Sequence, residues 1–432
     1  STNARTITIS GAGTSVTASS GTDAVTFNAG GLTYTGTITG EGTVNDTLQL
    51  STGADISGGT ISGVENLTLG SGANVSMSLT QFSGFNGTLT AAGSETLNLS
   101  GDGNFSTVAD IESYVLGDST TDARTITITN AGHSASATSA TDAVTFDTGG
   151  LTLTGTLTGE GTVNDTLSLG NGANISGATI SGIENLTLGS GASVSMTAAQ
   201  LGGFTGTVTA AGTETITLTA TGNASGASLA AIETIATAAD ASAQTVTLTA
   251  IQAAGKTLTA GDAGSDHFVI TGSAGNQAIT GSAGGDTIDG GAGNDSLYGF
   301  TGADFISGGD GADLLVGNSG ADTLNGGAGN DTFSGSASDF NGDLISGLAA
   351  GDVITINSAD LTALNGTTLG STINLGGPNT LNFSGAASNL KISASLNGGN
   401  TTLTFATPVV TPPSSGGGSS GPVVVTDNPT DT

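Results

Sequence analysis

Short runs in which polar and apolar residues alternate fill most of the chain, as at residues 6–9 (TITI), 32–35 (LTYT) and 215–218 (TITL). The runs are rich in Thr and β-branched residues, and Gly, Asn, Asp and Ser separate them. Alternation with period two is typical of strands with one buried face, and the separating residues favour turns. The pattern therefore predicts many short strands. Only residues 197–204, around AAQL, are predicted to form a helical turn.

Long stretches of the sequence repeat. ARTITI at Ala4 returns at Ala123, and ISGVENLTLGSGANVSM at Ile56 returns with few changes at Ile175, so both have an offset of 119 residues (123 − 4 and 175 − 56). A third copy begins at Ala243 and soon gives way to another pattern. Within the copies a shorter motif recurs, and it contains Glu65, Glu112, Glu184 and Glu233. The copies are therefore expected to consist of smaller rungs.

A β-solenoid fits this organisation better than a β-sandwich. Near-identical rungs can stack in register, and each rung then buries its apolar face against the next. The chain has only 16 aromatic residues (13 Phe, 3 Tyr and no Trp), and a thin solenoid interior accepts Leu, Ile and Val. The predicted fold class is all-β.

A different repeat, G-G-x-G-x-D-x-U-x with U a large apolar residue, runs from Gly261. The units begin at Gly261, Gly272, Gly281, Gly290, Gly299, Gly308, Gly317 and Gly326. In the second unit Gln277 replaces the aspartate, and Ile270 and Thr271 are inserted before it. The U residues, predicted to point into the core, are Phe268, Ile279, Ile288, Leu297, Ile306, Leu315, Leu324 and Phe333.

Each position of the nonapeptide has a physical assignment. Glycines at the first, second and fourth places allow positive φ and tight bends, which turn carbonyl oxygens toward one point. The aspartate adds a carboxylate there, and the last three residues form a short strand. If two units make one turn of a parallel roll, aspartates that are two nonapeptides apart in the sequence face each other. The predicted pairs are Asp286 with Asp304, Asp304 with Asp322, Asp295 with Asp313, and Asp313 with Asp331.

Carboxylates combined with carbonyl oxygens suit a hard cation that takes six to eight oxygen ligands, as Ca²⁺ does. Several Ca²⁺ ions are therefore expected in this segment. Asp266 is a further candidate ligand, although the substitution at Gln277 weakens a site that would join Asp266 to Asp286.

These nonapeptides resemble the RTX family of calcium-binding proteins, which are exported by type I secretion. The likeness covers residues 261–356, because DLISGLAAGDVITI at Asp343 to Ile356 is similar to the segment that closes such rolls. The resemblance implies that Asp352 is a candidate ligand at the end of the roll. It also implies export in the unfolded state and folding on extracellular Ca²⁺.

The upstream copies are more loosely similar to β-rich stretches of calcium-dependent S-layer and adhesin proteins of Gram-negative bacteria. The phrases that carry this likeness are ISGIENLTL and MTAAQL. No site residue is transferred from it.

Composition narrows the possible partners. The chain has 35 acidic residues, 4 Lys and Arg, and a net charge of −31. Nucleic acid and anionic membrane surfaces are excluded as main partners, because both require clustered basic residues. Without cysteine there are no disulfides and no thiolate zinc sites. No apolar run reaches the roughly 20 residues of a membrane span, so membrane insertion is not expected.

No set of residues indicates catalysis, so the chain is predicted not to be an enzyme and to have no catalytic residue. There is no HExxH motif, and the GxSxG at 417–421 lies in a Gly/Ser linker. His133 and His267 are interpreted as surface residues. The recurring glutamates are interpreted as rung-end ladders or outward faces, because catalytic pairs are built once, in unequal environments.

Asp46 and Asp165, in the repeated GTVNDTL, resemble single broken nonapeptide turns. Their carboxylates can either cap the turn or bind calcium, and turn capping is the favoured interpretation.

The expected organisation is two β-rich repeats at 1–122 and 123–242, a partial third repeat at 243–260, and the calcium-binding β-roll at 261–334. A roll-capping β region at 335–406 and a Pro/Gly/Ser linker and tail at 407–432 follow. The chain begins at Ser1 without a signal peptide, which indicates a processed or excised chain. The tail lacks an obvious export signal, so the natural protein is expected to extend further.

The expected function is that of a secreted structural protein, folded by Ca²⁺ and self-associating into an S-layer, filament or similar array on the bacterial cell surface. The alternative is an adhesin or biofilm-matrix protein that binds a surface or a glycan. A cell-surface glycan is also considered as the anchor.

Overall fold

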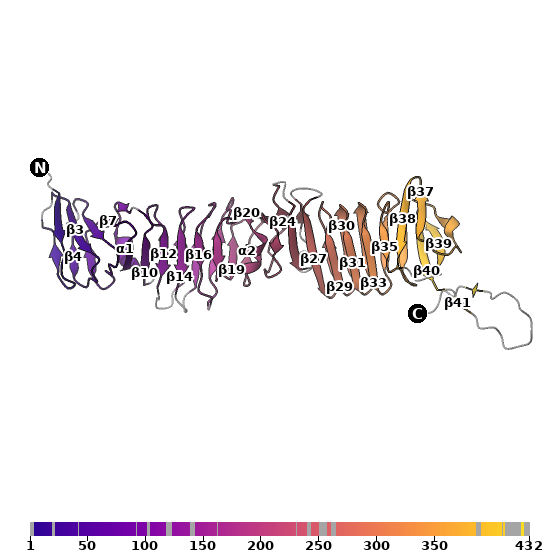
Figure 1. The fold of residues 1–432 in the computed structure, drawn as a ribbon, viewed down its shortest axis with the longest axis horizontal. Coiled ribbons are helices and arrows are strands. Elements are labelled where there is room, and N and C mark those ends of the chain that lie inside the picture. The colour runs from indigo at the N-terminus through magenta and orange to yellow at the C-terminus, as the bar shows by residue number, and fades with distance from the viewer. Residues whose placement is uncertain are drawn as a thin grey trace, which may run out of the picture. The chain divides into compact units, whose positions relative to one another are not determined.

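The computed structural model describes residues 4–19, 22–41, 43–91, 93–101, 104–117, 123–138, 143–161, 163–229, 231–239, 243–249, 257–260, 265–385, 390–407, 409–410 and 425–426. The chain forms two compact units. Unit 1 comprises Ser1–Thr215 and Gly226–Ala231, and unit 2 comprises Ile216–Ser225 and Ile232–Thr432. Parallel strands dominate both units (Figure 1).

Unit 1 is a β-solenoid in which successive rungs place parallel strands side by side. The first sheet contains β1 (Arg5–Thr8), β3 (Val25–Gly30), β5 (Thr47–Leu50), β7 (Asn66–Leu69) and β9 (Leu89–Thr90). A short sheet contains β2 (Val16–Thr17), β4 (Thr37–Thr39) and β6 (Thr60–Ser62). The third contains β8 (Asn74–Ser78), β10 (Thr96–Ser100), β12 (Ser113–Leu116), β14 (Ser134–Ala137), β16 (Thr156–Thr158) and β18 (Thr179–Ser181). The fourth contains β11 (Phe105–Ser106), β13 (Arg124–Thr127), β15 (Val144–Asp147), β17 (Thr166–Leu169), β19 (Asn185–Leu188) and β21 (Val208–Thr209). β20 spans Ser193–Met196.

The long repeat of the sequence reappears in three dimensions. β1 and β13 both have the sequence RTIT, and they pair with β3 and β15 in the same register. The rungs are unequal in length, since Arg5 pairs with Val25 and Thr47 with Asn66. Unequal rungs need turns of different lengths, and these turns carry the acidic residues described below.

Each copy also contains a helical turn. The predicted one is α2 (Ala198–Gly203), and its counterpart α1 (Leu79–Gly84) was missed because LTQFSG lacks the alanines of AAQLGG. Both helices start with a capping box, formed in α1 by Ser78 and Gln81. The Gln81 amide also donates to the carbonyls of Ile56 and Gly59, so the helix is anchored to the preceding rung.

Unit 2 is a more regular β-solenoid. One sheet holds β23 (Gly222–Asn223), β25 (Thr245–Thr249), β27 (His267–Ala274), β29 (Thr287–Ala292), β31 (Phe305–Asp310), β33 (Thr323–Ala328), β35 (Leu344–Ser346), β38 (Asn379–Ser384) and β37 (Thr372–Gly376). The other holds β28 (Ala278–Thr280), β30 (Ser296–Thr301), β32 (Leu314–Ser319), β34 (Thr332–Ser336), β36 (Val353–Asn357), β40 (Asn400–Ala406) and β39 (Lys391–Asn397). Further strands are β22 (Thr215–Leu218), β24 (Thr234–Thr237) and β26 (Thr257–Thr259), and the 3₁₀ helix η1 spans Thr362–Leu364.

Register in the roll of unit 2 advances by two nonapeptides a turn, as expected. Thr287 pairs with Phe305 and Phe305 with Thr323 in one sheet, while Ser296 pairs with Leu314 in the other. Two nonapeptides therefore make one turn of a parallel β-roll, and the all-β solenoid fold is confirmed.

Antiparallel strands follow the roll. β36 pairs antiparallel with β40, β39 with β40, and β37 with β38. Beyond them, β41 (Val409–Val410) pairs antiparallel with β42 (Val425–Thr426). The Gly/Ser linker and residues 427–432 lie outside the described residues.

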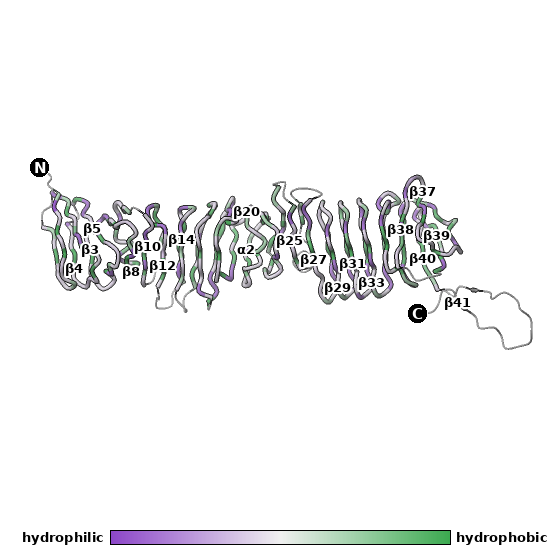
Figure 2. The backbone as a smooth tube through the Cα atoms, in the orientation of Figure 1, coloured by the Kyte–Doolittle hydropathy of each residue, from purple (hydrophilic) through white to green (hydrophobic). Residues whose placement is uncertain are grey.

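The core follows the alternation of the sequence, which Figure 2 shows as changes of hydropathy along the backbone. In the roll every U residue is fully buried. These eight side chains are Phe268, Ile279, Ile288, Leu297, Ile306, Leu315, Leu324 and Phe333. Because the inner side chains stack in register, the turns between strands also stack, and the aspartates lie in those turns.

Candidate metal centre

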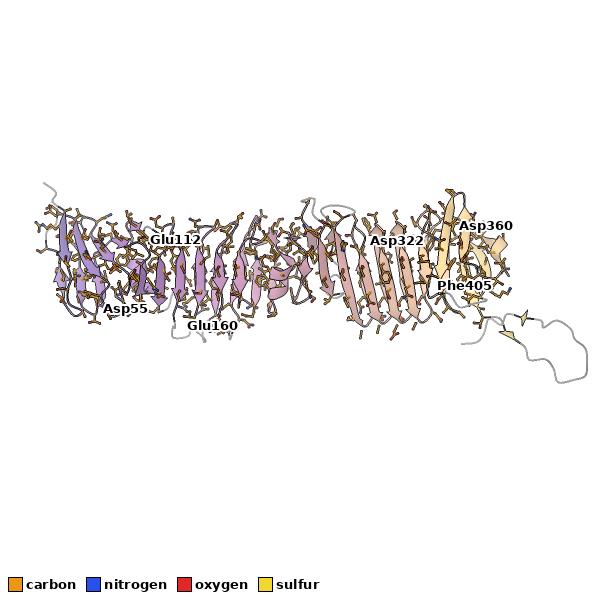
Figure 3. All side chains as sticks on the ribbon, in the orientation of Figure 1. Asp55, Glu112, Glu160, Asp322, Asp360 and Phe405 are labelled. Carbon is orange, nitrogen blue, oxygen red and sulfur yellow. The ribbon has the colours of Figure 1, made fainter. Side chains whose placement is uncertain are left out.

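The aspartates of the roll lie in two columns, and each carboxylate contacts the backbone one turn earlier. In the first column the N–H of Asp286 donates to Oδ1 of Asp304 at 2.7 Å, and the N–H of Asp304 donates to Oδ1 of Asp322 at 2.9 Å. Asp322, labelled in Figure 3, donates in turn to Oδ1 of Asp343 at 2.9 Å. Aspartates two nonapeptides apart thus meet as the spacing predicts.

The second column follows the same rule on the other sheet. The N–H of Asp295 donates to Oδ1 of Asp313 at 2.7 Å, and Asp313 donates to Asp331 at 3.0 Å. Asp331 donates to Oδ1 of Asp352 at 3.0 Å. Asp352, which only the family resemblance suggested, therefore ends this column.

Asp343 ends the first column, although its sequence context did not predict it as a ligand. It is 1% exposed, and Gly342-Asp343-Leu344-Ile345 repeats the D-x-U ending of the nonapeptide. This D-x-U match is the sequence signal for Asp343. It is weak because the glycines that precede the aspartate in a complete unit are missing.

Asp266 does not lie opposite Asp286 at the start of the first column. Oδ1 of Asp286 accepts the N–H of Phe268 at 2.7 Å, so Phe268 occupies the position opposite it. Oδ1 of Asp266 accepts the N–H of Gln244 from the preceding rung, and its Oδ2 accepts the hydroxyl of Thr237. The two inserted residues displace Asp266 from the column.

Gln277 occupies the first position of the second column. Its N–H donates to Oδ1 of Asp295 at 2.7 Å, and its side-chain amide donates to the Gly275 carbonyl. The amide therefore holds its own turn closed and adds no negative charge to the column.

The second carboxylate oxygen distinguishes these turns from ordinary capped turns. Among the residues that the structure describes, five buried Oδ2 atoms of the roll accept no hydrogen bond. They belong to Asp295, Asp304, Asp313, Asp322 and Asp331. A buried polar atom without a partner costs about 1–3 kcal/mol, and more when it is charged. Repetition over five consecutive units indicates a ligand position.

A carbonyl oxygen of the next turn lies near three of these atoms, those of Asp295, Asp304 and Asp313. A Cβ added to Gly290 would lie 2.5 Å from the carbonyl oxygen of Gly308 and 2.6 Å from Oδ2 of Asp295. The same pair of oxygens, one carboxylate and one carbonyl a turn later, meets at Gly281, Gly299 and Gly308. Such oxygen cradles fit Ca²⁺, which accepts carboxylates and carbonyls in flexible geometry.

Glycine therefore has two different roles in the unit. At the second place the backbone takes positive φ, with φ 104° at Gly309. First-place glycines such as Gly290 do not take positive φ, so that part of the prediction is wrong. They are required because any Cβ would occupy the oxygen cradle.

Without a bound cation, the surroundings of the buried aspartates disfavour their charged form. The pKa of Asp304 is raised to about 7, mainly by burial and also by the charges of Asp322 and Asp286, against the lowering effect of the Asp286 N–H. Burial likewise raises the pKa of Asp343 to about 7 and those of Asp322 and Asp331 to about 6. Without a cation, burial favours the neutral carboxyl, and a divalent cation would stabilise the charged form.

Side chains alone do not complete these sites. Across the described ranges, no three acidic or histidine side chains converge as a metal-binding group. One or two carboxylates with several turn carbonyls would have to hold each ion, as the cradle at Gly290 suggests.

The histidines differ from each other. His133 is only 2% exposed, and its Nδ1 lies 2.7 Å from Oγ1 of Thr107, so its interpretation as a surface residue is wrong. Phe82, Phe105 and Tyr114 form an aromatic cluster with its ring, whereas the first copy has Thr14 at that position. His267 lies partly exposed beside Thr245.

Comparison with known proteins gives one match. The RTX calcium-binding nonapeptide repeat family matches at residues 271–306, 280–315 and 307–339. No curated protein and no solved structure matches the chain. In the described part, no helix is long and apolar enough to cross a membrane. The matched residues coincide with the stacked turns and their aspartate columns, so this segment of the chain consists of RTX calcium-binding nonapeptide repeats folded as a parallel β-roll.

Proposed function

We propose that this chain is a secreted structural protein that folds on extracellular Ca²⁺ and assembles into an S-layer or similar surface array. The observation that carries the proposal is the pair of continuous buried carboxylate columns, from Asp286 to Asp343 and from Asp295 to Asp352. RTX repeats are typical of secreted proteins. Extracellular calcium modules bind in the range of about 10⁻⁴ to 10⁻³ M, which confines folding to the outside of the cell.

A structural role rather than catalysis is supported by the regularity of the molecule. The carboxylates recur in near-identical environments, whereas acid–base catalysis needs groups whose environments differ. Long repeats present the same surface many times, which favours repeated contacts between subunits. The net charge of −31 opposes such contacts until cations neutralise part of it.

Electron microscopy of the purified chain with and without millimolar Ca²⁺ tests the assembly. Ordered sheets or filaments are expected only with calcium, and dispersed monomers under both conditions would contradict the array. Circular dichroism during a calcium titration tests the folding step. The double variant Asp304→Ala/Asp313→Ala should weaken the rise in β signal, because each residue lies in the middle of a column.

A role as an adhesin or matrix protein is the second candidate, and Phe300 favours it. Phe300 occupies the second place of its nonapeptide at φ 86° and is 53% exposed. A non-glycine residue at positive φ costs free energy, and burial does not compensate for it here. An exposed aromatic kept at that cost suits contact with another surface. Loss of surface attachment in Phe300→Gly with assembly intact would favour this candidate.

A further inference from the structure

The turn around Asp46 in unit 1 makes the same contacts as the turn of Asp286, which begins the first column of the roll. Oδ1 of Asp46 accepts the N–H of Val25 at 2.7 Å, Oδ2 accepts the N–H of Glu41 at 2.9 Å, and the N–H of Asp46 donates to Oε2 of Glu65 at 3.0 Å. Asp286 has the matching set, namely an N–H of the preceding turn on Oδ1, an N–H of its own turn on Oδ2, and its own N–H on the next carboxylate.

The second repeat contains the same turn. Oδ1 of Asp165 accepts the N–H of Val144 at 2.7 Å, Oδ2 accepts the N–H of Glu160 at 3.0 Å, and the N–H of Asp165 donates to Oε2 of Glu184 at 3.1 Å. Burial and the charges of Glu184 and Glu160 raise the pKa of Asp165. Turn capping, the interpretation favoured from the sequence, is confirmed for Asp46 and Asp165. It does not exclude a cation, because Asp286 makes the same capping bonds.

The oxygen cradle is also present in unit 1. A Cβ added to Gly40 would meet Oδ2 of Asp46 and the carbonyl oxygen of Gly63. This is the arrangement found at Gly290, with a first-place glycine, a carboxylate of its own turn and a carbonyl of the next. Oε1 of Glu41, the residue after Gly40, is buried and accepts no hydrogen bond among the described residues.

A second kind of turn in unit 1 reproduces the unpartnered oxygen. Glu95 is 0% exposed, and its Oε1 accepts the N–H of Gly72 at 2.9 Å. Its N–H donates to Oε2 of Glu112 in the next rung, labelled in Figure 3. We call this series of N–H to carboxylate bonds between successive rungs the carboxylate ladder of unit 1. Within the described residues, Oε2 of Glu95 is buried and has no hydrogen-bond partner, and the same is true of Oδ2 of Asp295. Glu214 repeats the bond of Glu95, accepting the N–H of Gly191 at 2.8 Å.

The chain itself has few cations to neutralise these groups. It contains 4 Lys and Arg against 35 acidic residues, and Arg5 already pairs with Asp23 at 3.0 Å. A buried carboxylate that is not neutralised by a cation is costly. The counter-charge for the ladder of unit 1 must therefore come largely from outside the chain.

We propose that unit 1 binds its own Ca²⁺ ions at the turns of Asp46, Glu95 and Asp165, in addition to the ions of the roll. Each ion would take oxygens from the buried carboxylate and from turn carbonyls. The glutamates that the sequence repeats, Glu65, Glu112 and Glu184, complete the ladder behind these turns. This inference is independent of array formation.

Hydrogen–deuterium exchange of the full chain, with Ca²⁺ and with chelator, tests the proposal. Calcium is expected to slow exchange at Val25, Gly72 and Val144, whose N–H groups bond to the proposed ligands, by at least tenfold. Glu95→Gln is the sharpest variant, because glutamine keeps the Gly72 bond and replaces only the unpartnered oxygen. It should abolish calcium protection at Gly72 and leave exchange in chelator unchanged or slower, because a buried charge is removed.

Two matched variants serve as controls. Asp110→Asn removes an exposed carboxylate of the same unit that lies outside the ladder, and it should retain calcium protection at Gly72. Asp304→Asn removes a carboxylate of the roll, and it should also leave unit 1 protected.

The outcomes separate this inference from the proposed function. Equal exchange of unit 1 in wild type with and without calcium, while the roll responds, would overturn the inference and leave the calcium-dependent roll intact. If neither unit responds, both proposals fail. Glu95→Gln that keeps full calcium protection at Gly72 would exclude Glu95 as a ligand.

Discussion

The N–H of Asp322 donates to Oδ1 of Asp343 at 2.9 Å across a separation of 21 residues, although the other steps of this column span 18. The other column ends in the same way, with 21 residues between Asp331 and Asp352. A longer last turn therefore leaves the carboxylate in place. Stacking of the strands, rather than constant spacing, keeps each column continuous.

Asp343 should therefore act as a ligand position. Asp343→Asn keeps an oxygen that can accept the Asp322 N–H and removes the charge, so the midpoint of calcium-induced folding should rise severalfold. Circular dichroism during a calcium titration measures it. Asp310→Asn, which changes an exposed carboxylate of the roll, is the control and should leave the midpoint in place. Equal midpoints for both variants would remove Asp343 from the set.

Acid should partly replace calcium in the roll. In the folded chain the pKa of Asp304 is about 7 and that of Asp322 about 6, against about 4 when unfolded. The folded state then holds more protons, so stability without metal is fully present below pH 4 and is lost as pH rises to about 7. Urea unfolding in chelator at pH 4.5 and pH 8 measures this effect. Greater stability at pH 8 would contradict the raised pKa values.

Phe300→Gly should stabilise the roll. Gly291, Gly309 and Gly327 take φ of 91°, 104° and 98° at the same place, where Phe300 takes 86°. Relief of the positive-φ strain should add roughly 1–2 kcal/mol to the free energy of unfolding. Thermal unfolding in saturating calcium tests this, with Asn318→Gly (φ 63°) as the control that should gain less. A loss of stability would show that the phenyl ring contributes to folding.

Gly290→Ala should impair calcium binding more than folding alone explains. The new Cβ would compete for space with Asp295 Oδ2 and the Gly308 carbonyl, the proposed ligand oxygens. Calorimetric titration is expected to show fewer bound ions. Gly132→Ala, where a Cβ meets nothing within 4 Å, should bind calcium as wild type does. An unchanged ion count in Gly290→Ala would place the ions elsewhere.

Much of the site was predictable because it repeats. Period-two alternation predicted the strands, and a constant nonapeptide implied that Asp286, Asp304 and Asp322 share a column. Irregular positions were harder to predict. Asp343 lacks the preceding glycines, and the burial of His133 depends on Tyr114, which contacts it from another rung and itself packs against Phe82.

Sequence alone determined the all-β class, the register of two nonapeptides a turn in the roll and the chemistry of the turn oxygens, because each follows from local spacing and residue type. Only the tertiary structure decided which oxygens have no hydrogen-bond partner, and that Asp46 and Asp165 make the contacts of Asp286. Those properties depend on residues of neighbouring rungs. In the roll, for example, stacking buries Oδ2 of Asp304 without a partner and leaves Oδ1 on the Asp286 N–H. Because the rungs of unit 1 differ in length, no fixed sequence period predicts this stacking.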